Sequence, residues 1–105
     1  MKVALIVPDG FKDLAYLSTV LDGIDCHEII SGTSNGYELL EQYLVASSRD
    51  IIISKATASQ LKRAYNAIDA ADHVVILTHA QGIKTKKAIE YAQRHQKSST
   101  IFQVA

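Results

Sequence analysis

The sequence lacks long hydrophobic runs, a surplus of charge of either sign, and more than one cysteine. With Cys26 alone, the chain cannot form an internal disulfide, which fits a reducing compartment. We expect this cysteine to be a small buried side chain rather than a nucleophile. The first apolar run, Val3 to Val7, is too short for a signal peptide or a membrane span. The sequence therefore predicts a cytoplasmic protein that does not associate with membranes.

The formal net charge is zero, which argues against bulk binding of DNA or RNA. The charges are nevertheless unevenly distributed. Residues 1–50 carry three basic and eight acidic side chains, whereas residues 51–105 carry eight basic and three acidic ones. A basic rim at Lys84, Lys86 and Lys87 could attract a phosphorylated ligand. Chance segregation of charges on solvated faces explains the same asymmetry, and the sequence leaves both interpretations open.

Signatures of metal binding and of common catalytic sites are also absent. No cluster of His, Cys, Asp and Glu has the spacing of metal ligands, and no Walker A, Gly-x-Ser-x-Gly or Cys-x-x-Cys motif occurs. The sequence therefore predicts neither a metal site nor a resident cofactor. There is no linker, repeat or low-complexity stretch, so the 105 residues are expected to form one domain.

What the sequence contains is a regular alternation of apolar runs and helical periodicities. Strands are predicted over 3–7, 27–30, 51–53, 74–77 and 100–104, the third of them buried. Two helices are predicted over 11–21 and 37–47. A third follows a cap at Thr57 or Ser59 and has an inward stripe of Leu61, Ala64, Tyr65 and Ile68. A fourth begins at about Thr85. This pattern predicts a Rossmann-like three-layer α/β/α fold around a five-stranded parallel sheet of order 3-2-1-4-5.

Three loops are expected to meet beyond the carboxyl ends of the strands, where ligands bind in such sheets: 8–11, 31–36 and 78–85. The second loop resembles an anion site, in which free backbone N–H groups and the positive end of a helix dipole converge. Gly32 and Gly36 would permit positive φ and close backbone approach. Ser31, Thr33, Ser34 and Asn35 would add side-chain donors. A capped strand-to-helix turn without a ligand explains the same residues.

Several side chains near this edge have both a structural and a functional interpretation. Thr85 could cap its helix or donate to a phosphate. Arg63 could clamp a phosphate or lie on a helix surface. His79 could bond a ribose hydroxyl or act in acid–base chemistry, or be exposed without function. Asp9 needs no function in a turn, whereas lysines such as Lys84 at a helix start oppose the dipole and are easier to understand beside an anion.

Four segments carry a resemblance to a known family. The first segment runs from Pro8 to Asp13 and shares Phe11 and Asp13 with the family pattern, and the second runs from Ser31 to Glu38. The third is Arg63 to Asp72, and the fourth, Gln81 to Ala92, keeps Thr85, Ile89 and Ala92. In these segments the chain resembles the SLOG superfamily, small Rossmann-like proteins related to the "lonely guy" phosphoribohydrolases and to DprA. The closest likeness is to short stand-alone members from bacteria and phages.

The chain departs from the family pattern at positions that matter for catalysis. The Gly-Ser-Arg turn of the first segment is lost, and Thr33 and Lys84 occupy glycine positions. Lys86 and Lys87 stand just after Thr85, where the phosphoribohydrolases carry a glutamate near the helix start. These departures weaken the case for a hydrolase.

The resemblance implies a protein that binds a nucleotide or nucleotide-derived ligand, such as AMP or ADP-ribose, as a sensor or sequestering protein without efficient catalysis. Phe11 would stack on or shield the base or ribose. The candidate ligand-binding residues are Pro8, Asp9, Phe11, Ser31, Gly32, Thr33, Ser34, Asn35, Gly36, Arg63, Thr78, His79, Gly82, Lys84 and Thr85.

Two alternatives stay open. One is a nucleoside 5′-phosphate N-glycosidase that uses Glu38 or His79. The other is a ligand-free interaction module in which the side chains of Thr33 and Lys84 fill the phosphate space. Because family members often self-associate, a homodimer through Tyr16, Tyr37 and Tyr91 is a further expectation.

Overall fold

The computed structural model describes residues 1–56, 60–79 and 82–104. Strands and helices alternate along the chain: β1 (Lys2–Ile6), α1 (Leu14–Asp22), β2 (Glu28–Ser31), α2 (Ser34–Ser47), β3 (Ile52–Lys55), α3 (Gln60–Ala70), β4 (His73–Thr78), α4 (Ile83–Arg94) and β5 (Ser98–Gln103). All neighbouring strands run parallel, in the order β3-β2-β1-β4-β5. The predicted α/β fold and its strand order are confirmed. In the described ranges, every helix is too short or too polar to cross a membrane.

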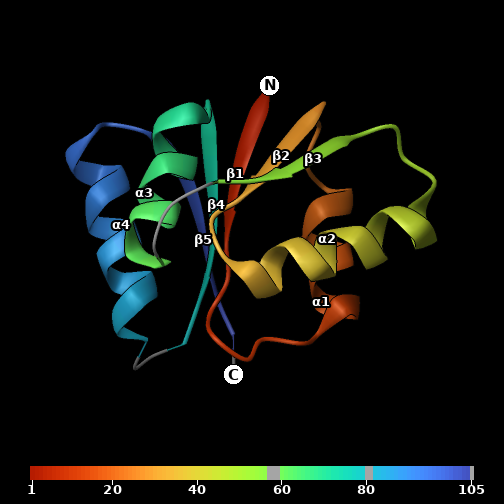
Figure 1. Cartoon of the computed structure of the whole chain (residues 1–105), viewed down its shortest axis with the longest axis horizontal. Helices are drawn as coiled ribbons and strands as arrows, with labels where there is room; N and C mark the ends of the chain where they lie inside the picture. The colour runs from red at the N-terminus through yellow and green to blue at the C-terminus, as the bar shows by residue number, and fades with distance from the viewer. Residues whose placement is uncertain (57–59, 80–81, 105) are drawn as a thin grey trace.

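The sheet lies between two helical layers, with α1 and α2 on one face and α3 and α4 on the other (Figure 1). The central strand β1 pairs with β2 and β4. Its side chains alternate, so Val3 and Leu5 pack toward α1 and α2, whereas Ala4 and Ile6 pack toward α3 and α4. Burial on both faces explains why this strand is a continuous apolar run in the sequence.

The two edge strands are much more exposed than the central ones. The prediction that the third strand is buried was wrong, because Ile52 in β3 is 63% exposed and Ile53 is only half-buried. β3 has β2 as its neighbour in the sheet and forms one edge. β5 forms the other edge, and its Ile101 is 42% exposed. A run of isoleucines therefore does not distinguish an edge strand from a buried one.

Local caps move the first two helices away from their predicted starts. α1 begins at Leu14 instead of Phe11, because the Asp13 carboxylate accepts a hydrogen bond from the Tyr16 N–H at 3.0 Å. α2 begins at Ser34, three residues earlier than predicted. There the Thr33 hydroxyl caps the helix and accepts from the Gly36 N–H at 3.2 Å. Half of the predicted polar loop is thus the first turn of a helix.

Of the other two helices, α4 differs from the prediction at its start, whereas α3 begins at Gln60, directly after the predicted cap Ser59. In the predicted stripe of α3, Ala64 and Ile68 are buried and Tyr65 is half-buried, while the side chain of Leu61 lies outside the described residues. The proposed caps of α3, Thr57 and Ser59, lie outside the described residues. α4 begins at Ile83 with Gly82 as its N-cap, so the prediction that Thr85 caps this helix was wrong.

A polar network ties the end of α1 to α2 and the loop after it. The Arg49 guanidinium donates to the Leu21 and Ile24 carbonyls at 2.8 Å each and to the Tyr43 hydroxyl at 2.9 Å. The Tyr43 hydroxyl in turn donates to the Asp22 carboxylate at 2.7 Å. Arg49 therefore binds backbone carbonyls at the end of α1 and just beyond it. Burial and the bond to Asp22 raise the pKa of Tyr43 above its ordinary value.

Candidate functional site

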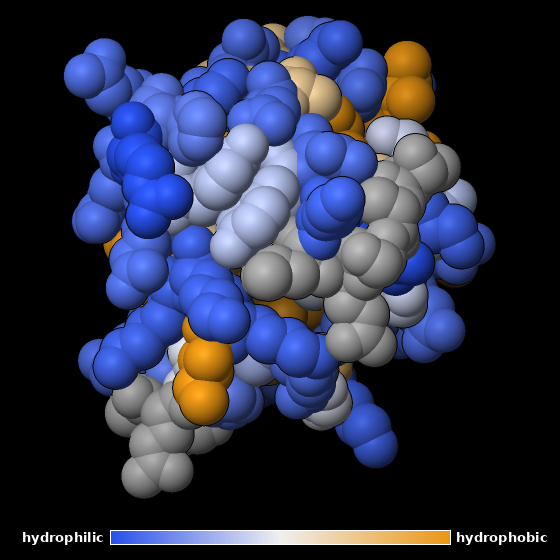
Figure 2. Space-filling view, turned by 60° about the vertical axis from the view of Figure 1, so that its left-hand side comes forward, coloured by the Kyte–Doolittle hydropathy of each residue, from blue (hydrophilic) through white to orange (hydrophobic). Residues whose placement is uncertain are grey.

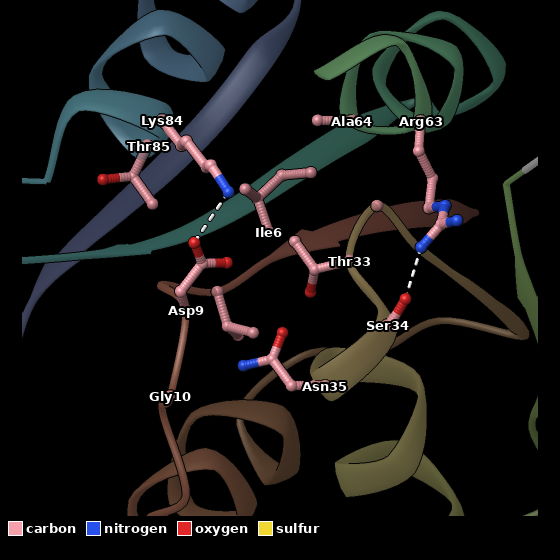
Figure 3. Close-up of a pocket in the computed structure, with 12 residues that line it drawn as sticks. Ile6, Asp9, Gly10, Thr33, Ser34, Asn35, Arg63, Ala64, Lys84 and Thr85 are labelled. Carbon is pink, nitrogen blue, oxygen red and sulfur yellow. Dashed lines mark hydrogen bonds and ion pairs between the residues drawn. The ribbon is translucent and has the colours of Figure 1, made fainter. Parts of the chain in front are cut away.

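A cavity of about 250 Å³ opens beside the carboxyl end of β1, where the strand order reverses. Its position is the one at which ligands bind in open α/β sheets. We call it the strand-end cavity. Segments from all three predicted loops and from α3 contribute to it (Figure 3). The lining residues are Ile6, Val7, Asp9, Gly10, Gly32, Thr33, Ser34, Asn35, Arg63, Ala64, Lys84 and Thr85.

Close packing explains the two glycines of the turn between β2 and α2. A Cβ at Gly32 would clash with the Ile6 side chain and lie 3.0 Å from the Cα of Ala64. A Cβ at Gly36 would lie 2.7 Å from the hydroxyl oxygens of Ser31 and Thr33. Both glycines are therefore closely packed, and neither uses the positive φ that glycine permits. Among the described glycines, positive φ occurs at Gly10 alone, with φ 78°.

Side chains of this turn hold it in shape through internal hydrogen bonds. The buried Ser31 hydroxyl donates to the Thr33 carbonyl at 2.6 Å and accepts from the Thr33 N–H at 3.2 Å. The structure therefore places Ser31 beneath the strand-end cavity, not in its wall. The Asn35 amide donates to the Pro8 carbonyl at 2.9 Å, which joins the first turn of α2 to the loop after β1. Together these bonds preorganise the wall formed by Thr33, Ser34 and Asn35.

Two cationic side chains approach the strand-end cavity from different walls (Figure 3). The Arg63 guanidinium, on α3, donates to the Ser34 hydroxyl. The Lys84 amine, on α4, lies 2.7 Å from a carboxylate oxygen of Asp9. Both members of that ion pair are well exposed, so water and salt screen it. The described lining residues thus carry two positive charges and one negative charge.

The N-terminus of α4 provides a further wall. Among the described residues no side chain caps this helix, and a Cβ on its N-cap residue Gly82 would lie 2.6 Å from the Thr85 hydroxyl oxygen. The Thr85 hydroxyl is buried and lies 2.6 Å from the Thr78 hydroxyl. Because backbone N–H groups in a first helical turn have no partner within the helix, this end is suited to an anion.

Other candidate residues lie beside the strand-end cavity and not in its lining. Phe11 packs into the core with 8% of its surface exposed. It also lines a separate hollow, which we call the Phe11 hollow: Gly10, Phe11, Lys12, Asn35, Glu38, Leu39 and Gln42. The catalytic candidate Glu38 belongs to this hollow, and the other, His79, lines neither concavity. Pro8, Gly36, Thr78 and Gly82 support the cavity through their backbone or buried side chains.

The sequence prediction missed four lining residues: Ile6, Val7, Gly10 and Ala64. Three of them could have been found. Val7 ends the first apolar run, Gly10 completes the turn that contains Pro8 and Asp9, and Ala64 follows the candidate Arg63 within the inward stripe of α3. Ile6 offers no such signal, because its side chain reads as an ordinary core residue.

Residues with a possible chemical role elsewhere do not form a second centre. Burial raises the pKa of the Cys26 thiol, although Arg49 acts in the opposite direction, so the neutral thiol is favoured. Tyr37 and Tyr91 are half-buried, and each contacts a neighbour: Lys55 lies over the Tyr37 ring, and Tyr65 stacks on Tyr91. Within the part of the chain that the structure describes, no group of His, Cys, Asp and Glu could hold a metal ion.

No protein-family model matches the sequence, and no curated protein matches it. Among solved structures, the siderophore periplasmic binding protein from the fuscachelin gene cluster of Thermobifida fusca is similar over 97% of this chain, with a TM-score of 0.40 and 13% sequence identity. The chain spans 34% of the length of that protein.

Proposed function

We propose that this protein binds a nucleotide or nucleotide-derived ligand, of the AMP or ADP-ribose type, in the strand-end cavity. It would act as a sensor or a sequestering protein without efficient catalysis. One observation carries the proposal: the first turns of α2 and α4 and the cations Arg63 and Lys84 converge on one cavity. Helix N-termini and cationic side chains are the groups that bind phosphate in α/β proteins. The resemblance of the same segments to the SLOG superfamily supports this ligand class.

The size of the strand-end cavity bears on how such a ligand would lie. Its volume of about 250 Å³ is below the roughly 300–1,000 Å³ of pockets that enclose drug-sized ligands. It would therefore hold a phosphate and ribose, and the base would extend out of it. The Phe11 hollow shares Gly10 and Asn35 with the cavity, so it is the neighbouring place for a base. Phe11 would then contact the base from the core side.

The arrangement of carboxylates favours binding without turnover. Among the described lining residues, Asp9 supplies the carboxylate, and it is engaged by Lys84. Glu38 projects from α2 into the Phe11 hollow instead. A nucleotide N-glycosidase needs an acidic group at the bond between base and ribose. With Asp9 paired, the cavity is better equipped to hold a phosphate than to cleave that bond.

Native mass spectrometry with AMP, ADP-ribose, NAD and cyclic nucleotides tests the proposal. The wild type should gain the mass of at least one nucleotide, and Ser34→Asp should abolish that gain, because a carboxylate beside Arg63 repels phosphate. An acidic residue in the first turn of α2 is compatible with the helix dipole, so the variant should fold. Gln93→Asp adds the same charge at an exposed position of α4 and should bind normally.

A wild type that gains no mass from any nucleotide would overturn the proposal and favour the interaction module. Loss of ligand mass with time, together with release of free base, would instead indicate the N-glycosidase.

A further inference from the structure

The ion pair between Asp9 and Lys84 joins two walls of the strand-end cavity across 75 positions of sequence. Lys84 is the second residue of α4, where a cation is unfavourable beside the positive end of the helix dipole. The Asp9 carboxylate, at 2.7 Å, compensates that position. The Asp9 carboxylate thus lies where an anionic ligand would be stabilised. Such a ligand must bind beside this carboxylate or displace it from Lys84.

We propose that Asp9 makes this cavity selective for phosphates that carry one negative charge, such as phosphodiesters, over phosphomonoesters that carry two. The inference rests on the proposed nucleotide-binding function and names the ligand class within it. Its basis is the charge of the described lining side chains, in which Arg63 and Lys84 are offset by Asp9 to a net charge of +1. A singly charged phosphate matches this side-chain charge, whereas a second charge on the ligand has only the helix N-termini, and no further side chain of the described lining, to offset it.

Geometry makes the repulsion between Asp9 and a second ligand charge unavoidable while the ion pair stays intact. A phosphate oxygen bonded to the Lys84 amine lies about 2.8 Å from it. Since the same amine is 2.7 Å from the Asp9 carboxylate, the two oxygens are then at most about 5.5 Å apart. This separation is shorter than the Debye length of roughly 8 Å at physiological ionic strength, so salt weakens the repulsion, as it weakens the exposed ion pair, without removing it.

Calorimetric titration with a matched pair of ligands tests the inference. AMP is a monoester whose second phosphate pKa is about 6, so it carries two charges at pH 8. Its P-methyl ester is a diester of nearly the same shape with one charge, and adenosine is the uncharged reference. Each is titrated into the wild type, into Asp9→Asn, and into Asp25→Asn. The last variant removes the same charge from an exposed position before β2, at the amino ends of the strands and thus at the opposite end of the sheet from the cavity.

The wild type should bind the methyl ester more tightly than AMP. Asp9→Asn should raise the affinity for AMP by about fivefold, the upper range for an exposed pair, and change that for the methyl ester by less than about twofold. Asp25→Asn should change neither affinity.

The inference is overturned if the wild type prefers AMP, or if the ratio of the two affinities is the same in the wild type and in Asp9→Asn. Failure of the wild type and of Asp9→Asn to bind any of these ligands would overturn the inference, and it would overturn the proposed function as well if the wild type also gains no nucleotide mass in the native mass spectrometry above. Thermal unfolding of each variant checks that it is folded.

Discussion

The two faces of the sheet are packed in different ways. Toward α1 and α2 the layer is filled by large side chains, among them Leu17, Leu21, Leu40 and Tyr43. Toward α3 and α4 the helices contribute mainly alanines: Ala64, Ala67, Ala88 and Ala92. Burial of apolar area stabilises a fold roughly in proportion to that area, so the first face contributes more stability. The small residues of the second face instead let α3 approach the turn at Gly32, which shapes the strand-end cavity.

The same two faces differ in charge. Most exposed acidic residues lie in the segments around α1 and α2, whereas most exposed basic residues lie on α3 and α4. Hydrophilic residues cover most of the α3 and α4 side (Figure 2). The charge asymmetry along the chain is therefore an asymmetry between faces. The strand-end cavity lies where they meet, with Asp9 and Lys84 facing each other from either side. The other two lysines of the proposed basic rim, Lys86 and Lys87, are exposed and do not line the cavity.

The largest effect is expected from Leu40→Ala on the large-residue face. Leu40 is fully buried, and its truncation leaves a cavity, so the free energy of unfolding should fall by about 3 kcal/mol. Ligand affinity should stay near the wild-type value, because Leu40 does not line the strand-end cavity. Urea unfolding and nucleotide titration check both outcomes. A loss of less than about 1 kcal/mol would contradict the view that this face dominates stability.

A smaller effect on stability but a larger one on binding is expected from Ala67→Leu on the alanine face. A Cβ at Gly32 would already lie 3.5 Å from the Cβ of Ala67, so a leucine there pushes α3 away from the turn. Overpacking of this kind costs about 2 kcal/mol. Nucleotide affinity should fall as Ala64 and Arg63 move with the helix. Ala46→Leu, on the exposed side of α2, is the matched enlargement and should alter neither property. Unchanged binding in Ala67→Leu would break the proposed division of roles.

The smallest effect is expected from Tyr43→Phe, which removes one hydroxyl from the Arg49 network. The cost should be about 1 kcal/mol at pH 8, the net value of a typical hydrogen bond. Because the pKa of Tyr43 is raised in the folded state, the stability that its neutral form provides is complete below the unfolded-state pKa of about 10. It is lost as pH rises through the folded-state pKa. The difference between wild type and variant in urea unfolding should therefore narrow above pH 10.

Tyr91→Phe is the comparison for the size of this effect. It removes an exposed hydroxyl bonded to Asp69 and should cost less. The bond to Asp69 raises the pKa of Tyr91 as well, so its smaller difference should narrow in the same direction. A difference between wild type and Tyr43→Phe that stays constant above pH 10 would contradict the role assigned to the neutral hydroxyl.

The sheet and the place of the site could be predicted because both depend on periodicity and topology. β1 and β4 are continuous apolar runs, as expected of strands covered on both faces, and this places both of them inside the sheet. The starts of the helices could not be predicted as well. Gly36 has the pattern of a loop residue, yet it lies inside α2. The position requires glycine because the hydroxyls of Ser31 and Thr33 leave no room for a Cβ. Such a reason exists only in three dimensions.

The ion pair at the site illustrates the same limit. Asp9 in the sequence is a turn residue after Pro8, and Lys84 is a cation at a helix start. Neither pattern reveals that the two lie 2.7 Å apart, because the contact depends on how the first and fourth strands are placed side by side. The charge balance of the strand-end cavity therefore becomes visible only once the fold is known.

The central position of β1 also has a consequence for the order of events during synthesis. Val3 pairs with Ile29 on one side and with His73 on the other, so one of its two partners is translated about 70 residues later. At roughly 5–20 residues per second, β1 waits about 4–14 s for that partner. Throughout this interval the nascent chain exposes an unpaired apolar edge, which is prone to aggregation. The central strand of the folded sheet is thus the one whose unpaired edge must be kept from aggregating for the longest time during synthesis.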